Sequence, residues 1–264
     1  MSPSTELLAL SSVEMRRRIG TKEISPVELV EASIARIEAL NPALNAIAAR
    51  DFARARKLAV SAEAAARKGE QLGALHGLPT GIKDLHETAG LLTTYGSPLY
   101  RDHVPAHDAA MVALVRKAGA IILCKTNVPE FGAGANTRNL VWGATGNPFD
   151  PRLNAGGSSG GSAVALACDM LPVCTGSDTG GSLRNQPRSA ALWVFVRRRA
   201  SCRWTADRSA GRRSRYWAQW GAAWQIYDFY SRPRSEWTTA SRWPSRSIPL
   251  RSRPRGRSIS VGCA

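Results

Sequence analysis

The amino-acid sequence predicts an α/β fold, with helices packed on a sheet, for residues 1–185. Segments with the 3.6-residue apolar spacing of a helix alternate with short apolar segments typical of strands, and several helical segments carry recognisable start and stop residues. The chain has 264 residues, of which 44% are hydrophobic, and this is enough to bury a sizeable core.

The first clear helix lies in SPVELVEASIARIEALNP, residues 25–42. Ser25 stands three residues before Glu28, which is the spacing of a capping box, and Pro26 takes the first helical position. Apolar residues then recur at helical spacing until Asn41 and Pro42, where we expect the helix to stop.

The elements that follow alternate in type. An alanine-rich segment over 53–68 predicts a helix that ends at Gly69. HGLPTGIKDL, residues 76–85, predicts a short strand that carries Lys83, with the side chain of Asp84 on the opposite face. A helix capped at Asp108 and stopped by Gly119 precedes an apolar strand over 121–123.

Residues 186–264 have a different composition. They hold 17 arginines, no lysine and three acidic residues, whereas residues 1–185 hold 19 basic and 17 acidic residues. The same segment contains seven of the eight tryptophans and shows no sustained helical or strand period. We therefore expect two units, 1–185 and a poorly ordered tail over 186–264, in which no element is predicted.

The composition excludes several classes of protein. No run of about 18 apolar residues predicts a membrane helix, and the basic cluster near the start follows the apolar stretch instead of preceding it, unlike a secretory signal. The five cysteines are odd in number and lack CxxC spacing, which argues against a disulfide framework or a zinc site. A cytoplasmic location is the simplest expectation.

Two glycine- and serine-rich loops are the candidates for chemistry. NAGGSSGGSAVALACDM, residues 154–170, runs into a predicted helix over 159–170, and VCTGSDTGGSLRN, residues 173–185, runs toward another. Glycines allow backbone amides to approach a ligand, and a helix N-terminus adds unpaired N–H donors. A lone loop of this kind is more often a linker, and a phosphate-binding loop is disfavoured because no lysine follows its last glycine.

A serine nucleophile needs a base, and the four histidines all precede these loops. The order serine, acid, histidine that accompanies a nucleophile elbow is therefore absent. Surface or loop positions are the simpler interpretation of the histidines, although His76 and His86 flank the Lys83 segment. A lysine can serve as the base if burial keeps it neutral. Lys83, in its apolar strand, is the candidate.

Three segments in order, GLPTGIKD, GNPFDPRLNAGGSSGGSA and GSDTGGSLRN, resemble the landmark segments of the amidase signature family. The resemblance implies the N-terminal portion of a mixed central β-sheet flanked by helices. It also implies hydrolysis of a carboxamide, or transfer of its ammonia, through a serine acyl-enzyme. Neither a metal nor an organic cofactor is implied.

The resemblance also implies roles for residues. Lys83 falls on the base, Ser158 on a bridging serine held by a cis peptide, and Ser182 on the acylated nucleophile. Backbone amides would form an oxyanion hole, and further motif positions would support the loops. The oxyanion-hole residues are Thr179, Gly180 and Gly181, with the amide of Ser182, and the supporting residues are Gly156, Gly157, Ser159, Asp178 and Arg184.

The resemblance stops near residue 185, and family members are usually much longer. We interpret the change as an out-of-frame tail from about Gln186, which resequencing would test, and expect weak or no amidase turnover from this chain. An inactive fragment is the main alternative. Nucleic-acid binding by the arginines and tryptophans of the tail is a lesser one. The partner expected is a small-molecule amide, with a homodimer or an amidotransferase complex left open and membrane association not expected.

Overall fold

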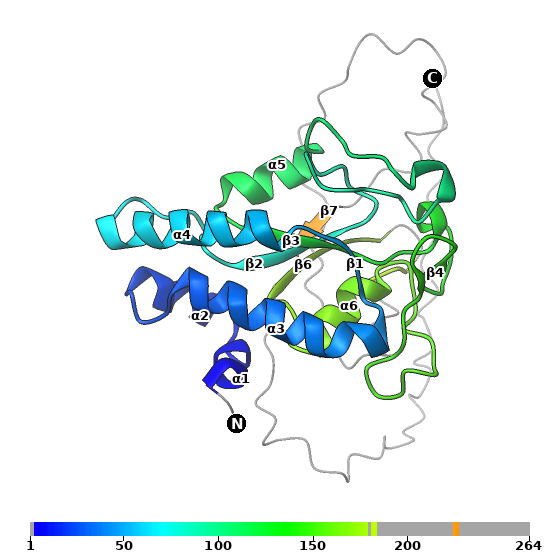
Figure 1. The fold of residues 1–264 in the computed structure, drawn as a ribbon, viewed down its shortest axis with the longest axis horizontal. Coiled ribbons are helices and arrows are strands. Elements are labelled where there is room, and N and C mark those ends of the chain that lie inside the picture. The colour runs from blue at the N-terminus through cyan, green and yellow to red at the C-terminus, as the bar shows by residue number, and fades with distance from the viewer. Residues whose placement is uncertain (1–2, 179–180, 184–223, 227–264) are drawn as a thin grey trace, which may run out of the picture. The chain divides into compact units, whose positions relative to one another are not determined.

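The computed structural model describes residues 3–178, 181–183 and 224–226, which form helices around a five-stranded sheet (Figure 1). The α-helices are α1 (Pro3–Leu8), α2 (Ser12–Gly20), α3 (Pro26–Leu44), α4 (Phe52–Lys68), α5 (Ala110–Lys117) and α6 (Gly160–Ala167). The strands are β1 (Ile47–Arg50), β2 (Pro79–Lys83), β3 (Ile121–Thr126), β4 (Arg138–Asn139), β5 (Gly143–Ala144), β6 (Val173–Ser177) and β7 (Trp224–Ile226). Two short 3₁₀ turns are η1 (Pro98–Tyr100) and η2 (Glu130–Gly132).

The sheet is mixed, with the strand order β1-β3-β2-β6-β7. Strand β2 lies in its centre and pairs in parallel with both β3 and β6, while β1 pairs antiparallel to β3 and β7 antiparallel to β6. Strands β4 and β5 form a separate two-stranded sheet. The expected mixed sheet flanked by helices is therefore confirmed.

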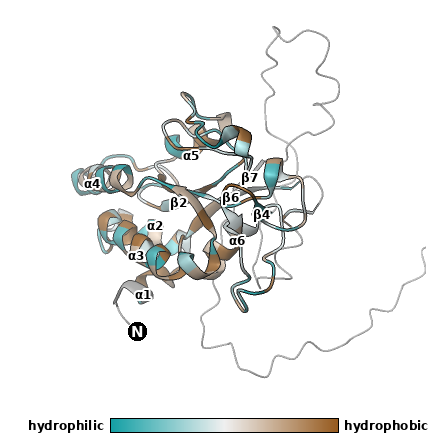
Figure 2. Cartoon of the chain, turned by 45° about the vertical axis from the view of Figure 1, so that its right-hand side comes forward, coloured by the Kyte–Doolittle hydropathy of each residue, from teal (hydrophilic) through white to brown (hydrophobic). Residues whose placement is uncertain are grey.

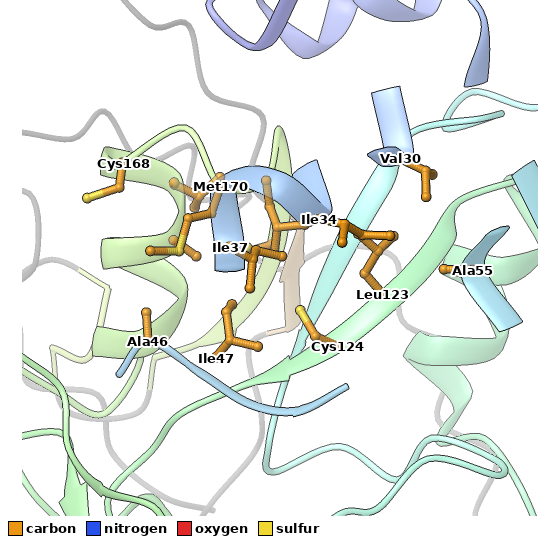
Figure 3. Close-up of a cluster of buried hydrophobic side chains, with 14 of the residues drawn as sticks. Val30, Ile34, Ile37, Ala46, Ile47, Ala55, Leu123, Cys124, Cys168 and Met170 are labelled. Atoms are coloured by element: carbon orange, nitrogen blue, oxygen red, sulfur yellow. The ribbon is translucent and has the colours of Figure 1, made fainter. Parts of the chain in front are cut away.

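The main core lies between the sheet and the helices α3, α4 and α6. Ile34 and Ile37 of α3 are buried against Leu123 of β3, and Ala55 of α4 joins the same cluster. Figure 3 shows these side chains gathered between the helices and strand β3. In Figure 2, α3 carries both hydrophobic and hydrophilic residues, which fits an amphipathic helix with one face in the core.

Side-chain alternation along the strands decides which face each residue joins. Ile122 of β3 and Ile82 of β2 pack with α5 in a second cluster, whereas Leu123 faces the first. Because successive residues of a strand point to opposite faces, Lys83 points away from the α5 face that Ile82 joins. The central strand thus places Lys83 on the face on which α6 lies.

The predicted elements of residues 25–126 are confirmed, with changes at some ends. Helix α3 does not stop at Asn41 but continues through Pro42 to Leu44, where Asn45 in the left-handed conformation (φ 48°) ends it. Pro42 removes one hydrogen bond from the helix, that of its own missing N–H, and other contacts offset this loss. The last turn also buries Leu44, and both ends of the Asn41 side-chain amide bond to the backbone of Ile47.

The N-cap of α5 is Ala109 instead of the predicted Asp108, and no side chain caps this helix. The carboxylate of Asp108 bonds to other groups instead of to the first N–H groups of the helix. It accepts the backbone N–H of Ala89 at 2.7 Å and forms a salt bridge with Arg116 at 2.6 Å. The helix predicted over 159–170 is shorter, since Cys168 already caps α6.

Most of the tail predictions lie outside the described residues. The exception is 224–226, where no element was predicted and where β7 pairs with β6. Without β7, the N–H and C=O groups along one edge of β6 would have no strand partner, and a short segment can form hydrogen bonds with them. Among the described helices, none has the length and apolar content that crossing a membrane requires.

The capping box at the start of α3 gives a stability test. The side chain of Ser25 accepts the N–H of Val27 at 3.0 Å and donates to Glu63 at 2.5 Å, while Glu28 accepts the N–H of Ser25. We expect Ser25→Ala to lower the free energy of unfolding by about 1–2 kcal/mol in urea denaturation. Ser61→Ala, at an exposed serine inside α4, should change it far less, and equal effects would contradict the capping role.

Candidate active site

Lys83, the last residue of the central strand β2, is fully buried and surrounded by hydroxyl groups. Its Nζ lies 2.8 Å from Ser158 Oγ, 2.8 Å from Ser159 Oγ and 2.9 Å from Ser177 Oγ. The carbonyl oxygen of Ser177 is 3.4 Å away. No carboxylate lies within salt-bridge distance of Lys83 in the described part of the chain, so its polar environment consists of neutral dipoles.

Ser158 connects the amine to a second serine. Its Oγ lies 2.9 Å from Ser182 Oγ, so Lys83, Ser158 and Ser182 form one continuous chain of hydrogen bonds. The Gly157–Ser158 peptide bond is cis. Ser158 and Ser159 immediately precede α6, and Ser182 follows β6, so three separate elements meet at this point.

Burial lowers the pKa of Lys83 to about 7, and the negative charge of Asp178 opposes this shift. The cause is that the charged amine would lose its hydration without gaining an adjacent carboxylate. This shift favours the neutral amine at pH 7, which is the form that a lysine acting as a base requires.

The glycines of GGSSGG lie where a side chain would collide with neighbouring atoms or where the backbone has a positive φ. A side chain at Gly157 would lie 2.9 Å from the carbonyl carbon of Ala135, and one at Gly160 would collide with Thr137. Gly156 has a φ of +77°, in the left-handed region that favours glycine. The predicted supporting role of Gly156 and Gly157 remains a prediction.

Gly161 allows the tightest of these contacts. A Cβ added there would lie 2.3 Å from the backbone nitrogen of Asn127 and 2.6 Å from the carbonyl oxygen of Ala46. We expect Gly161→Ala to lower the free energy of unfolding by about 3 kcal/mol, because backbone on two sides must move. Gly20→Ala is the matched control, since its added methyl would meet only the flexible Arg16 side chain. Equal melting temperatures for the two variants would contradict this packing.

The carboxylate of Asp178 organises the loop that carries Ser182. It accepts the backbone N–H of Gly181 at 2.6 Å and that of Leu183 at 3.2 Å. The Gly181 amide, predicted as an oxyanion donor, is therefore engaged by Asp178 in this structure. Thr179, Gly180 and Arg184, the other predicted residues of this loop, lie outside the described residues.

Ser177, which contacts the amine, was not among the residues predicted from the sequence. Ser177 ends β6 and Lys83 ends the adjacent parallel strand β2, so both lie at the carboxyl edge of the sheet. Because ligand sites form at that edge in parallel sheets, the last residue of β6 was the available signal.

A second buried lysine was also missed. Lys125 of β3 donates to the carbonyl of His86 and to the hydroxyls of Thr88 and Thr93, and its Nζ lies 3.9 Å from the carboxylate of Asp84. The Asp84 carboxylate in turn accepts the Thr94 hydroxyl at 2.6 Å. This network turns Asp84 away from the serines that hold Lys83.

His86 lies in the loop that follows β2, which agrees with the loop alternative, but its side chain is buried and does not lie at the surface. Burial and the nearby charges of Lys125 and Lys83 lower its pKa to about 3, so the imidazole is neutral at pH 7. The backbone carbonyl of His86 accepts a hydrogen bond from Lys125, which holds this loop close to β3. Among the described residues, no group of three or more His, Cys, Asp and Glu side chains is placed to hold a metal ion.

The amidase family model, described as "Amidase", matches residues 28–189. The chain belongs to the amidase family. A glutamyl-tRNA(Gln) amidotransferase subunit of Streptomyces coelicolor is 38% identical to it over 193 residues, which cover 73% of this chain and 39% of that relative. The corresponding protein of Azoarcus sp. is 44% identical over 183 residues, which cover 69% of this chain and 37% of the relative.

Among solved structures, 6-aminohexanoate cyclic dimer hydrolase superposes with a TM-score of 0.64 at 33% identity, over 70% of this chain and 37% of that one. The fold described above is thus the fold of amidase family members. The chain spans less than half the length of each of these three relatives.

Proposed function

We propose that the chain reacts with carboxamides through Ser182, which becomes acylated while Ser158 and Lys83 carry its proton away. The observation that supports this most directly is the unbroken path from the Lys83 amine through Ser158 to Ser182, with separations of 2.8 and 2.9 Å. A serine becomes a useful nucleophile when a neighbouring base takes its proton during attack.

The surroundings of Lys83 suit a neutral amine. Such an amine has two N–H donors and one lone pair, and three serine hydroxyls lie within 2.9 Å. If Ser159 and Ser177 accept the two N–H groups, the lone pair is left to accept the proton of Ser158. The two flanking serines would thereby orient the base.

In the proposed reaction, the Ser182 oxygen forms a bond to the amide carbonyl carbon, its proton passes to Ser158, and the proton of Ser158 passes to Lys83. The path then runs in reverse: Ser158 protonates the amide nitrogen, and the C–N bond breaks to release ammonia or an amine. A water molecule attacks the acyl-enzyme by the same route and releases the carboxylate. The backbone amides of Thr179, Gly180 and Ser182 would stabilise the tetrahedral oxyanion, whereas the Gly181 amide donates to Asp178.

The substrate class we propose is a carboxamide of a small molecule. The name of the amidotransferase relatives suggests the side-chain amide of glutamine as one member of this class. The name of the dimer hydrolase suggests cyclic amides as another. The amidotransferase name also suggests assembly with other chains, which would be a further step beyond the chemistry of Ser182.

The test is covalent labelling instead of turnover, because labelling requires only the nucleophile and its base. The whole chain is incubated with phenyl N-methylcarbamate, and its intact mass and peptide map are recorded. We expect one methylcarbamoyl group on Ser182. A folded chain that gains no mass, or gains it on other residues, would contradict the proposal and favour an inactive amidase relative.

A further inference from the structure

Strands β2 and β6 separate just before Lys83. In the described strands, the pair formed by Gly81 and Cys174 is the last one in register between them, although β2 continues for two more residues. On its other side, β2 stays paired with β3 as far as Lys83, which lies opposite Thr126. The backbone of Lys83 is therefore aligned by β3 but lies beyond the regular pairing with β6.

A side chain takes the place of the β6 backbone at this point. The backbone N–H of Lys83 donates to the hydroxyl of Thr175 at 2.8 Å, and both residues are fully buried. In a regular parallel ladder such an N–H bonds to a carbonyl of the neighbouring strand. A buried N–H without any partner is costly, so the Thr175 hydroxyl allows the two strands to diverge while the N–H of Lys83 stays paired.

Thr175 is itself held by other hydroxyl groups, and we name Thr126, Ser162 and Thr175 the hydroxyl bridge. Ser162 Oγ, in the first turn of α6, donates to the carbonyl of Thr175 at 2.8 Å. Thr126 Oγ1 lies 2.6 Å from Ser162 Oγ. Because the single proton of the Ser162 hydroxyl is used on Thr175, Thr126 donates in this second contact. The bridge thus connects β3 to β6, the two strands that flank β2, through α6.

The same elements carry the groups that surround the Lys83 amine. Ser158 and Ser159 immediately precede α6, and Ser177 ends β6. Their three Oγ atoms lie 2.8, 2.8 and 2.9 Å from Lys83 Nζ, so a small displacement of the end of β2 would lengthen all three contacts. The bridge fixes α6 relative to β6, and Thr175 ties the backbone of Lys83 to both.

We infer that Thr175 is a positioning residue, whose hydroxyl holds the end of β2 so that the Lys83 amine meets Ser158. This inference rests on the proposed acylation of Ser182. Thr175 acts through the backbone of Lys83 and takes no proton itself. Loss of its hydroxyl should therefore slow the reaction while the base and the nucleophile are both still present.

The test is the rate at which phenyl N-methylcarbamate labels Ser182 in Thr175→Val, a change that removes the hydroxyl but keeps the side-chain shape. The rate is measured at about pH 8.5, above the pKa of about 7 that burial gives Lys83, so that it reports position instead of protonation. We expect labelling about tenfold slower. Misplacing a catalytic group by about 1 Å costs about 10²-fold, and one lost hydrogen bond should move Lys83 by less.

Two further variants separate positioning from stability. Thr175→Ser keeps the hydroxyl and should label at nearly the rate of the unmodified chain. Thr80→Val is the matched control, because Thr80 is a fully buried threonine of the same strand β2 whose hydroxyl bonds to the carbonyl of Leu78. It should lower the melting temperature without slowing the labelling of Ser182.

Ser162→Ala covers the case that Thr175→Val does not fold, because it breaks the bridge but leaves the N–H of Lys83 paired. We expect labelling about threefold slower, toward the lower end of what one hydrogen bond corresponds to. Its control is Ser33→Ala, since the buried Ser33 hydroxyl of α3 has no hydrogen-bond partner within the described residues. This control should label like the unmodified chain.

An unchanged labelling rate in folded Thr175→Val, or in Ser162→Ala where the valine variant does not fold, would overturn this inference but not the proposed function. Thr175→Ser that labels as slowly as Thr175→Val would overturn it too, because the hydroxyl would then not be the group that matters. No labelling of Ser182 in the unmodified chain would overturn both the inference and the proposed function.

Discussion

Replacing Ser182 with alanine is expected to abolish covalent labelling by phenyl N-methylcarbamate, with no modification transferred to another serine. The physical reason is that Ser182 is the end of the hydrogen-bond path: its oxygen is 2.9 Å from Ser158 Oγ, and Ser158 is in contact with Lys83. We do not expect Ser158 to replace it as the nucleophile, because Ser158 is only 4% exposed and its oxygen already contacts the Lys83 amine.

The measurement is the intact mass of the chain after exposure to the reagent over several hours. Ser61→Ala provides the control, since this exposed serine bonds only to the backbone of its own helix and should label like the unmodified chain. A Ser182→Ala chain that still gains one methylcarbamoyl group at the original rate would show that the nucleophile is elsewhere.

Lys83→Met should slow labelling of Ser182 by about 10²–10⁴-fold, the usual contribution of a general base. Methionine has nearly the same length and fills the buried site, so loss of the amine is the main change. In the unmodified chain the labelling rate should rise as the pH increases through about 7, because burial holds the pKa of Lys83 there and only the neutral amine accepts a proton. In Lys83→Met this inflection should disappear.

The same lowered pKa affects stability. Between pH 7 and about 10.5, the unfolded chain holds a proton on Lys83 that the folded chain has released, so the free energy of unfolding rises with pH in this window. Below about pH 7 both states are protonated, and the cost of burying the charge is constant. Lys83→Met should flatten the rise in melting temperature over this range but not remove it, because burial also lowers the pKa of Lys125 to about 8.

A pH profile of labelling that is unchanged in Lys83→Met would contradict the role of Lys83 as the base. A flattened stability profile without any loss of labelling rate would show that the buried amine is structural only. The two measurements therefore separate a base from a merely buried lysine.

The fold was predictable where local signals and tertiary packing agree. The Ser25 capping box and Gly69 mark helix ends that the structure places within one residue of the expectation. The stop expected at Pro42 was wrong, because burial of Leu44 and the hydrogen bonds between Asn41 and Ile47 offset the one hydrogen bond that the proline removes. The cap expected at Asp108 was wrong because its carboxylate has a partner distant in sequence, Ala89.

The candidate site was predictable only in part. Lys83, Ser158 and Ser182 lie in recognisable motifs, and the structure brings their side chains together. Ser177 lies in the segment GSDTGGSLRN, but the resemblance assigned it no role, and Lys125 lies in none of the three segments. Their contacts arise from strand pairing, which places residues far apart in sequence side by side, and local sequence patterns do not contain that pairing.

The position of Lys83 on the middle strand has a consequence for how the site moves. Local opening is least frequent in central strands and most frequent in loops, so amide protons of β2 should exchange with solvent deuterium only when the whole sheet comes apart. The serines stand on connecting loops, whose amides should exchange sooner. The Lys83 amine would then keep its position while the hydroxyl groups of Ser158 and Ser182 move relative to it. The rate of proton transfer would depend on the motion of the loops that carry these serines.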